Sequence, residues 1–220
     1  MRLTVYPVTI RVGNLLNNRD IYMAMTASNM LALGQQAANF CLPDTEGKSA
    51  SLADYKGNKG LVIAFICNHC PYVIHIAPQL AKVALEYQKK GIDFVAINSN
   101  DTEQYPDDDM PHMIEEKRKR NYPFAYLLDE TQNVAKAYSA ACTPDIYLFN
   151  AEKKLVYRGQ FDSSRPTRIS SGNYDSTKHQ ATGSDLTQAM DALLEGKPIE
   201  PTQTPSIGCN IKWKMEGQAD

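Results

Sequence analysis

The stretch that decides the fold is residues 61–71, LVIAFICNHCP. Residues 61–66 are a continuous apolar run, which predicts a β-strand buried on both faces. Residues 71–90 then repeat apolar side chains with helical spacing, and a glycine, typical of helix ends, follows them. Cys67 and Cys70 are therefore expected where a buried strand ends and an amphipathic helix begins.

This position favours thiol chemistry. The free backbone N–H groups and the dipole of a helix N-terminus stabilise a thiolate, and a free thiol is largely protonated at neutral pH without such help. His69, between the two cysteines, adds positive charge when it is protonated. Cys67 is predicted to be the nucleophile, as the earlier and more exposed thiol. Cys70, one turn inward, is predicted to resolve a mixed disulfide by attacking Cys67.

The sequence on either side of the motif alternates strands and helices. Two parallel strands joined by a helix make a right-handed crossover unit, and a β-hairpin follows later in the chain. This order predicts an α/β fold with a mixed sheet and helices on both faces. The expected strands are residues 61–66, 92–98, 125–128, 145–150 and 155–159, and the expected helices are residues 71–90, 107–120, 129–138 with Asp129 at the N-cap, and one beginning at Ser184.

Composition narrows the function classes. The chain has 220 residues, 43% of them hydrophobic, and a net charge of −2, which argues against a nucleic-acid partner. It has no apolar run long enough for a transmembrane helix, so no membrane association is expected. Its five cysteines are too few and too scattered for a secreted disulfide framework, and no signal peptide is recognised, so a cytoplasmic location is predicted.

The chain is predicted to have three parts. Residues 1–31 show no clear periodicity and are expected to be an N-terminal appendage. Residues 32–196 form the expected domain, and residues 197–220, with three prolines, form an extended tail. Inside the domain, residues 161–183 are polar and are expected to form a long loop of the kind that often carries function.

A cysteine pair with this spacing is also half of a zinc site. Zinc normally requires a second pair of ligands with similar spacing, and the sequence has none. His75 lies on the same predicted helix but is expected to face water. No metal or other cofactor is therefore expected, although a copper- or zinc-binding module remains an alternative function, because soft thiolates suit both metals.

A second feature is Cys142-Thr143-Pro144-Asp145, directly before the predicted hairpin. Proline at the start of a strand is common because it has no N–H to donate. The alternative is a cis-proline that packs against the cysteine pair and leaves an exposed strand edge for a substrate backbone. The sequence leaves both open.

Together these motifs resemble the thioredoxin superfamily, and residues 35–195 resemble its redoxin branch, the alkyl hydroperoxide reductase/thiol-specific antioxidant group that includes peroxiredoxins. The likeness lies in FCLPD at residues 40–44, SLADYKG at 51–57, CNHCPYV at 67–73, YRGQFD at 157–162 and GCNIKW at 208–213. The cysteine pair points to a peroxiredoxin-like subgroup that keeps a C-x-x-C motif. The resemblance implies a thioredoxin-like three-layer sandwich around a central mixed sheet.

The resemblance also implies roles. Cys67 would be the attacking thiol, Cys70 the resolving thiol, and Pro144 the cis-proline, with Thr143 and Pro144 at the substrate. Arg158 and Arg165 are expected either to line the site or to form surface pairs.

The implied activity is thiol–disulfide exchange with protein or small-molecule disulfides, supported by a reductant such as thioredoxin or glutathione. Peroxiredoxins instead use the second position, Cys70, against peroxides. A thiol peroxidase with antioxidant function is therefore an alternative, although the motif that precedes their cysteine is absent here. The oligomeric state is not predicted.

Overall fold

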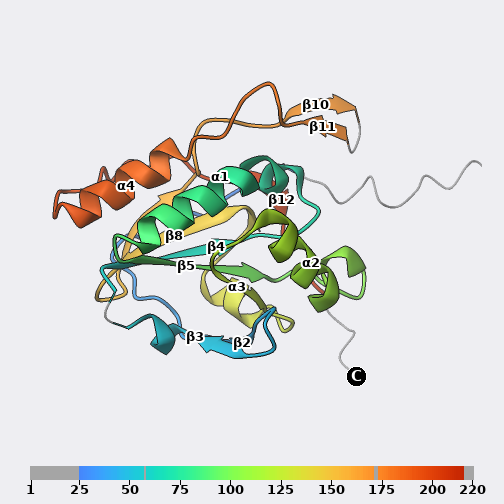
Figure 1. The fold of residues 1–220 in the computed structure, drawn as a ribbon, viewed down its shortest axis with the longest axis horizontal. Helices are drawn as coiled ribbons and strands as arrows, with labels where there is room; N and C mark the ends of the chain where they lie inside the picture. The colour runs from blue at the N-terminus through green and yellow to red at the C-terminus, as the bar shows by residue number, and fades with distance from the viewer. Residues whose placement is uncertain (1–24, 57, 171–172, 216–220) are drawn as a thin grey trace, which may run out of the picture.

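The computed structural model describes residues 25–56, 58–170 and 173–215 (Figure 1). Its centre is a mixed sheet of five strands in the order β6-β5-β4-β8-β9. Strands β4, β5 and β6 are parallel to one another, β8 is antiparallel to β4, and β9 is antiparallel to β8. The mixed sheet expected from the sequence is thereby confirmed. The strands are β4 (Gly60–Phe65), β5 (Ile92–Asn98), β6 (Ala125–Leu128), β8 (Asp145–Asn150) and β9 (Leu155–Gly159).

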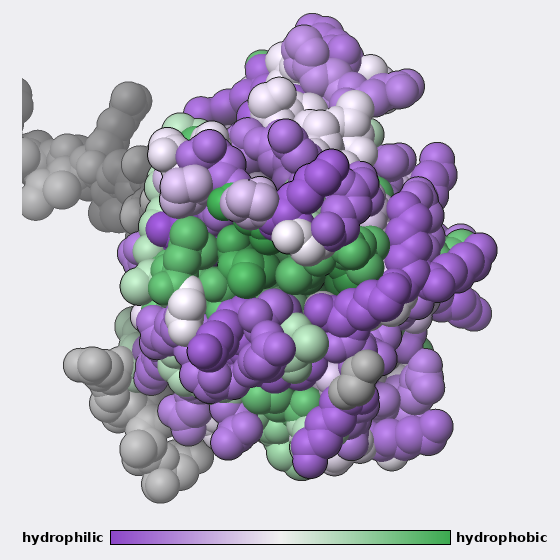
Figure 2. Space-filling view, turned by 90° about the vertical axis from the view of Figure 1, so that its left-hand side faces the viewer, coloured by the Kyte–Doolittle hydropathy of each residue, from purple (hydrophilic) through white to green (hydrophobic). Residues whose placement is uncertain are grey.

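Two layers cover the sheet, because β4 and β8 send apolar side chains to both faces. One buried cluster joins alternate residues of β4 to helices α1 (Pro71–Gln88), α2 (Met110–Arg120) and α4 (Ser184–Leu194). The opposite cluster joins the remaining residues of β4 to helix α3 (Asn133–Ala137) and to the segment of strands β2 (Cys41–Pro43) and β3 (Ser49–Ser51). Figure 2 shows a hydrophobic band between hydrophilic regions above and below it.

Three predicted elements differ in detail. Helix α2 begins at Met110 and not at residue 107, because Pro106–Asp108 form a separate 3-10 helix and Asp109 is the N-cap of α2. Helix α3 is shorter than residues 129–138, and Gln132, not Asp129, occupies its N-cap. Asp129 instead lies one turn earlier, and its carboxylate accepts the N–H groups of Val134 and Ala135. The polar loop at residues 161–183 contains a small hairpin, β10 (Thr167–Ser170) and β11 (Asn173–Asp175). None of the described helices is long and apolar enough to cross a membrane.

A small second sheet lies at one end of β8. It has the order β1-β12-β7, with strands β1 (Met25–Ala27), β12 (Ile207–Asn210) and β7 (Cys142–Thr143). Of the two interpretations of Pro144 that the sequence leaves open, the structure has the cis-proline, but the exposed strand edge expected with it is covered, because β12 pairs with β7. The division into three parts stays a prediction, and residues 1–24 lie outside the described ranges. The structure adds that residues 25–27 and the tail pair with each other.

Candidate active site

The C-x-x-C motif lies at the carboxyl end of the central strand β4. Every residue of β4 is buried, and Cys70 is the N-cap of α1, with Pro71 at the first helical position, where its missing N–H costs nothing. Cys67 is 2% exposed and Cys70 0%. Both thiols are therefore buried, and Cys67 is only slightly more exposed than Cys70, because segments distant in sequence cover the motif.

Thr143 contacts both cysteines. Its hydroxyl lies 3.3 Å from Cys67 Sγ, and Cys70 Sγ donates to its carbonyl oxygen at 3.0 Å. The peptide bond between Thr143 and Pro144 is cis. The structure thus brings together four of the residues singled out in the sequence: the two cysteines, Thr143 and Pro144.

The two thiols differ in acidity. Burial raises the pKa of Cys67 well above its ordinary value, and its hydrogen bond with Cys70 and the charge of Asp108 act in the same direction. Burial also opposes ionisation of Cys70. The Cys70 sulfur, however, accepts hydrogen bonds from the thiols of Cys209 and Cys67 and from the backbone N–H of Val73, which hold its pKa well below the ordinary value. The negative charge of a half-ionised pair therefore resides on Cys70.

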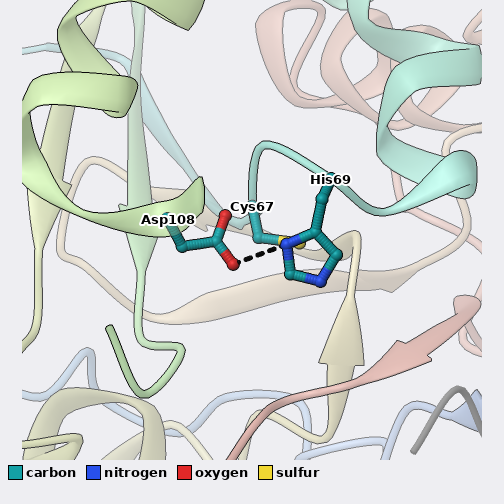
Figure 3. A group of neighbouring side chains, drawn as sticks. All are labelled: Cys67, His69 and Asp108. Atoms are coloured by element: carbon teal, nitrogen blue, oxygen red, sulfur yellow. Dashed lines mark ion pairs between the residues drawn. The ribbon is translucent and has the colours of Figure 1, made fainter. Parts of the chain in front are cut away.

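His69 is held by an acid that the sequence analysis did not single out. Its Nδ1 lies 2.8 Å from Oδ2 of Asp108, whose side chain is fully buried (Figure 3). The Asp108 carboxylate also accepts the N–H of Asn68 and a side-chain N–H of Asn100. Burial lowers the pKa of His69, but the hydrogen bond and charge of Asp108 outweigh it and raise that pKa above 6.5. A protonated imidazole is thereby favoured beside the two thiols.

The same residues have the donor atoms of a metal site. Cys67 Sγ, an imidazole nitrogen of His69 and a carboxylate oxygen of Asp108 all lie within 4.8 Å of one another. Thiolate, imidazole and carboxylate are all zinc ligands, and three protein ligands leave a fourth position open. Binding would have to replace the hydrogen bond between His69 and Asp108, so the metal and the ion pair are alternatives.

The tail adds a buried cation. Lys212 is 3% exposed and donates to Oδ1 of Asn210 at 2.8 Å. Burial lowers its pKa, whereas the charges of Cys209, Cys67 and Cys70 oppose that shift, which places its ammonium group in the electrostatic field of all three sulfurs. Tyr105 is near both cationic side chains: its ring stacks on His69 with centroids 5.8 Å apart, and Lys212 Nζ is 5.7 Å from its centroid.

The two arginines are placed differently. Arg165 lines a cleft together with Pro144 and His75, and it donates to the backbone oxygen of Asp162. Arg158 instead donates to the side chain of Gln203 in the tail, at 2.9 Å. The expectation that His75 faces water is wrong, because it is 6% exposed and its Nε2 lies 2.8 Å from the hydroxyl of Ser164.

The architecture and sequence have clear relatives. An uncharacterized conserved protein from Geobacillus kaustophilus is 50% identical, with a TM-score of 0.80 over 87% of this chain and 97% of that one. The thioredoxin domain of a thiol-disulfide oxidoreductase from Bacteroides vulgatus is 24% identical, with a TM-score of 0.50 over 58% of this chain and 88% of that one, which supports the thioredoxin-like fold alone.

Sequence comparison leads to the family. Thiol-disulfide oxidoreductase ResA of Halalkalibacterium halodurans is 29% identical over 71% of this chain and 82% of its own length. The model of the AhpC/TSA family matches residues 33–158, more than half of the chain. The protein therefore belongs to the AhpC/TSA family, the redoxin branch of the thioredoxin superfamily.

Proposed function

We propose that this protein is a thiol–disulfide oxidoreductase that cycles Cys67 and Cys70 between a dithiol and a disulfide. One observation carries the proposal: Cys67 and Cys70 lie at the end of β4, and both sulfurs contact Thr143. The name of the ResA relatives, thiol-disulfide oxidoreductase, agrees with this chemistry.

The reaction has two exchange steps. Cys67 transfers its proton to Cys70, and its thiolate attacks an external disulfide R–S–S–R′, forming Cys67–S–S–R and releasing R′S⁻. Cys70 gives that proton to the departing R′S⁻, and its thiolate, which the N–H of Val73 stabilises, attacks Cys67 Sγ. The bond to R breaks, RS⁻ leaves, and the enzyme holds the Cys67–Cys70 disulfide. Two electrons have passed from the cysteine pair to the substrate, and the one proton of the half-ionised pair ends on the first released thiolate.

His69 assists both steps electrostatically. Its imidazolium, held by the buried carboxylate of Asp108, lies beside the sulfurs and stabilises negative charge there. The His69 imidazolium is thus a positive charge next to the sulfurs, whereas the residues of β4 are all uncharged. We therefore assign His69 a stabilising role and Asp108 a positioning role.

A second candidate, a thiol peroxidase, is favoured by one observation, the lowered pKa of Cys70. A Cys70 thiolate would attack a peroxide ROOH, take one oxygen as a sulfenic acid and release ROH after protonation. Cys67 would then displace water to give the same disulfide. Burial hinders access in both routes, because Cys70 is 0% exposed and Cys67 2%, so reactivity towards the two oxidants distinguishes the candidates.

The two candidates differ in their oxidant. The reduced protein is mixed with oxidised glutathione or with hydrogen peroxide at equal concentration, and the loss of free thiols is followed in time. Faster oxidation by glutathione supports the oxidoreductase. Faster oxidation by peroxide, with a trappable sulfenic acid on Cys70, rejects it in favour of the peroxidase.

The class of partner follows from this proposal. We propose disulfide substrates and a thiol reductant such as thioredoxin or glutathione, since the oxidised pair must be reduced for a further cycle. The cytoplasmic location stays a prediction.

A further inference from the structure

The C-terminal strand β12 brings a third cysteine to the motif. Cys209 lies opposite Thr143 in the antiparallel pairing of β12 with β7, and it is 4% exposed. Thr143 is the residue that contacts both Cys67 and Cys70. The strand therefore lies where an extended substrate segment would otherwise pair with β7, and it presents a thiol there.

A glycine permits this close approach. A Cβ atom on Gly208 would lie 2.0 Å from the carbonyl oxygen of Thr143 and 2.6 Å from its carbonyl carbon. Real side chains do not tolerate such distances to backbone atoms, so β12 reaches β7 because residue 208 has no side chain.

Cys70 is the central sulfur of a three-thiol cluster. The side chains of both Cys67 and Cys209 shift its pKa, and Thr143, which contacts Cys67 and Cys70, lies opposite Cys209 in the pairing of β7 with β12. The three residues belong to one buried cluster. Cys142 is also buried, but its thiol points to the carbonyl oxygen of Pro144 at 3.5 Å. Cys70 is thus placed to form a disulfide with either of two cysteines, whereas Cys142 serves as a matched buried control.

We propose that Cys209 is a third redox cysteine, which exchanges with the Cys67–Cys70 disulfide to form a Cys70–Cys209 disulfide. The inference rests on the proposed function, because that reaction supplies the first disulfide. The Cys209 thiolate attacks Cys70 Sγ, the bond between Cys67 and Cys70 breaks, and Cys67 leaves as a thiolate that takes the proton of Cys209. No external oxidant is needed, and the number of disulfides is unchanged.

The surroundings suit this transfer of charge. Burial and the hydrogen bond with Cys70 disfavour a Cys209 thiolate, so the negative charge must be stabilised while it moves. Lys212, three residues along the tail, lies in the field of all three sulfurs, and His69 lies on the Cys67 side. The exchange would return Cys67 to the thiol state while the tail holds the oxidising equivalent.

The test is a time course of disulfide mapping. Reduced full-length protein is treated with a stoichiometric amount of oxidised glutathione, quenched in acid, alkylated, digested and analysed by mass spectrometry. We expect the Cys67–Cys70 disulfide first and the Cys70–Cys209 disulfide afterwards, with Cys67 alkylated in the second species. Complete alkylation of Cys209 at every time, while Cys67–Cys70 accumulates, would overturn the proposal and leave the proposed function intact. Absence of any disulfide on Cys67 or Cys70 would overturn both.

Variants sharpen the result. In Cys67→Ser, glutathione attached to Cys70 is expected to be displaced by Cys209, giving the Cys70–Cys209 disulfide directly. In Cys142→Ser the wild-type pattern is expected, because that thiol is directed to the carbonyl oxygen of Pro144. A Cys70–Cys142 disulfide in place of Cys70–Cys209 would reject the assignment. The wild-type time course decides the matter even where a variant fails to fold.

Discussion

At the scale of single residues, the site gives the identical thiols of Cys67 and Cys70 different acidities and therefore different roles. Burial and the charge of Asp108 keep Cys67 protonated, while hydrogen-bond donors surround Cys70. Because Cys67 is protonated, its attack on the substrate disulfide is slowed. Because Cys70 has a low pKa, its attack on the mixed disulfide is accelerated. The surroundings of each sulfur therefore determine which cysteine attacks the substrate and which one resolves the mixed disulfide.

The first prediction concerns these two roles. Cys70→Ser is expected to accumulate a mixed disulfide on Cys67 when it meets a disulfide substrate, because the resolving sulfur is gone. Cys67→Ser is expected to lose the Cys67-linked adduct. Intact-mass measurement after reaction with oxidised glutathione, followed by peptide mapping, tests both. A glutathione adduct that maps to Cys70 in the wild-type protein would reverse the roles.

The second prediction concerns the buried ion pair. Asp108→Asn is expected to lower the pKa of His69, because Asp108 is what raises it above 6.5. A raised folded-state pKa stabilises the protein below 6.5, and that stabilisation is lost as the pH rises through the folded-state pKa. The variant should therefore lose more stability below pH 6.5 than well above it.

The measurement is an NMR titration of the histidines combined with denaturant unfolding at two pH values. Asp109→Asn is the matched control, because Asp109 pairs with the exposed His112 and not with His69. An unchanged His69 titration in Asp108→Asn would show that the imidazole does not depend on this carboxylate.

Sequence patterns identified the cysteines, His69 and the Thr143-Pro144 pair, since strand-to-helix position and local motifs define them. In the sequence Asp108 is the middle one of three consecutive acids, residues 107–109, at the start of the predicted helix 107–120. Its neighbour Asp109 does cap α2 by accepting the N–H of His112. Nothing local distinguishes the acid that turns inward, because its partners lie 8 to 40 residues away in the chain.

At the scale of elements, strands buried on both faces and amphipathic helices were well predicted. The bounds of β5, β6, β8 and β9 agree with the sequence analysis, because their apolar patterns are strong. The short strands β1, β7 and β12 were not predicted. Their pairing is long-range, and strands of two to four residues carry almost no periodic signal.

The third prediction concerns β12. Gly208→Val is expected to displace β12 from β7, since the new side chain would collide with the backbone of Thr143. Uncovering the motif should raise the alkylation rate of Cys67 by about tenfold or more, equivalent to about 1.4 kcal/mol in the opening equilibrium.

Alkylation of Cys67 is followed by mass spectrometry under native conditions. Thr202→Val is the control, because this tail residue is exposed and lies outside β12. Equal alkylation rates in wild type and Gly208→Val would contradict the covering role of the strand. The same variant is expected to lose the Cys70–Cys209 disulfide while still forming Cys67–Cys70.

The fourth prediction concerns α1, the helix that carries the motif. Leu80→Ala, at a fully buried position, is expected to lower the free energy of unfolding by about 2–5 kcal/mol through lost burial and a cavity. Leu85→Ala lies on the same helix but at a side chain that is 52% exposed, so it is expected to cost about 0.5 kcal/mol or less. Urea unfolding compares the two, and equal costs would contradict the packing of α1.

At the scale of the whole molecule, the domain folds its own tail over its reactive centre. Segments from both ends of the described chain, β1 and β12, form one sheet with β7. The tail contributes a thiol, Cys209, and a buried cation, Lys212, to the site. The tail is thus part of the redox centre in this account, and a substrate that pairs with β7 must first displace it.

The central claim, a reversible Cys67–Cys70 couple, is tested most directly by a redox titration. Cys209→Ser protein, in which Cys67–Cys70 is the disulfide this account allows, is equilibrated in glutathione buffers of graded ratio, quenched in acid and mapped. We predict a single two-electron transition in which Cys67 and Cys70 lose reactivity to alkylation together. Full alkylation of both cysteines at every ratio, or oxidation of one without the other, would contradict the account.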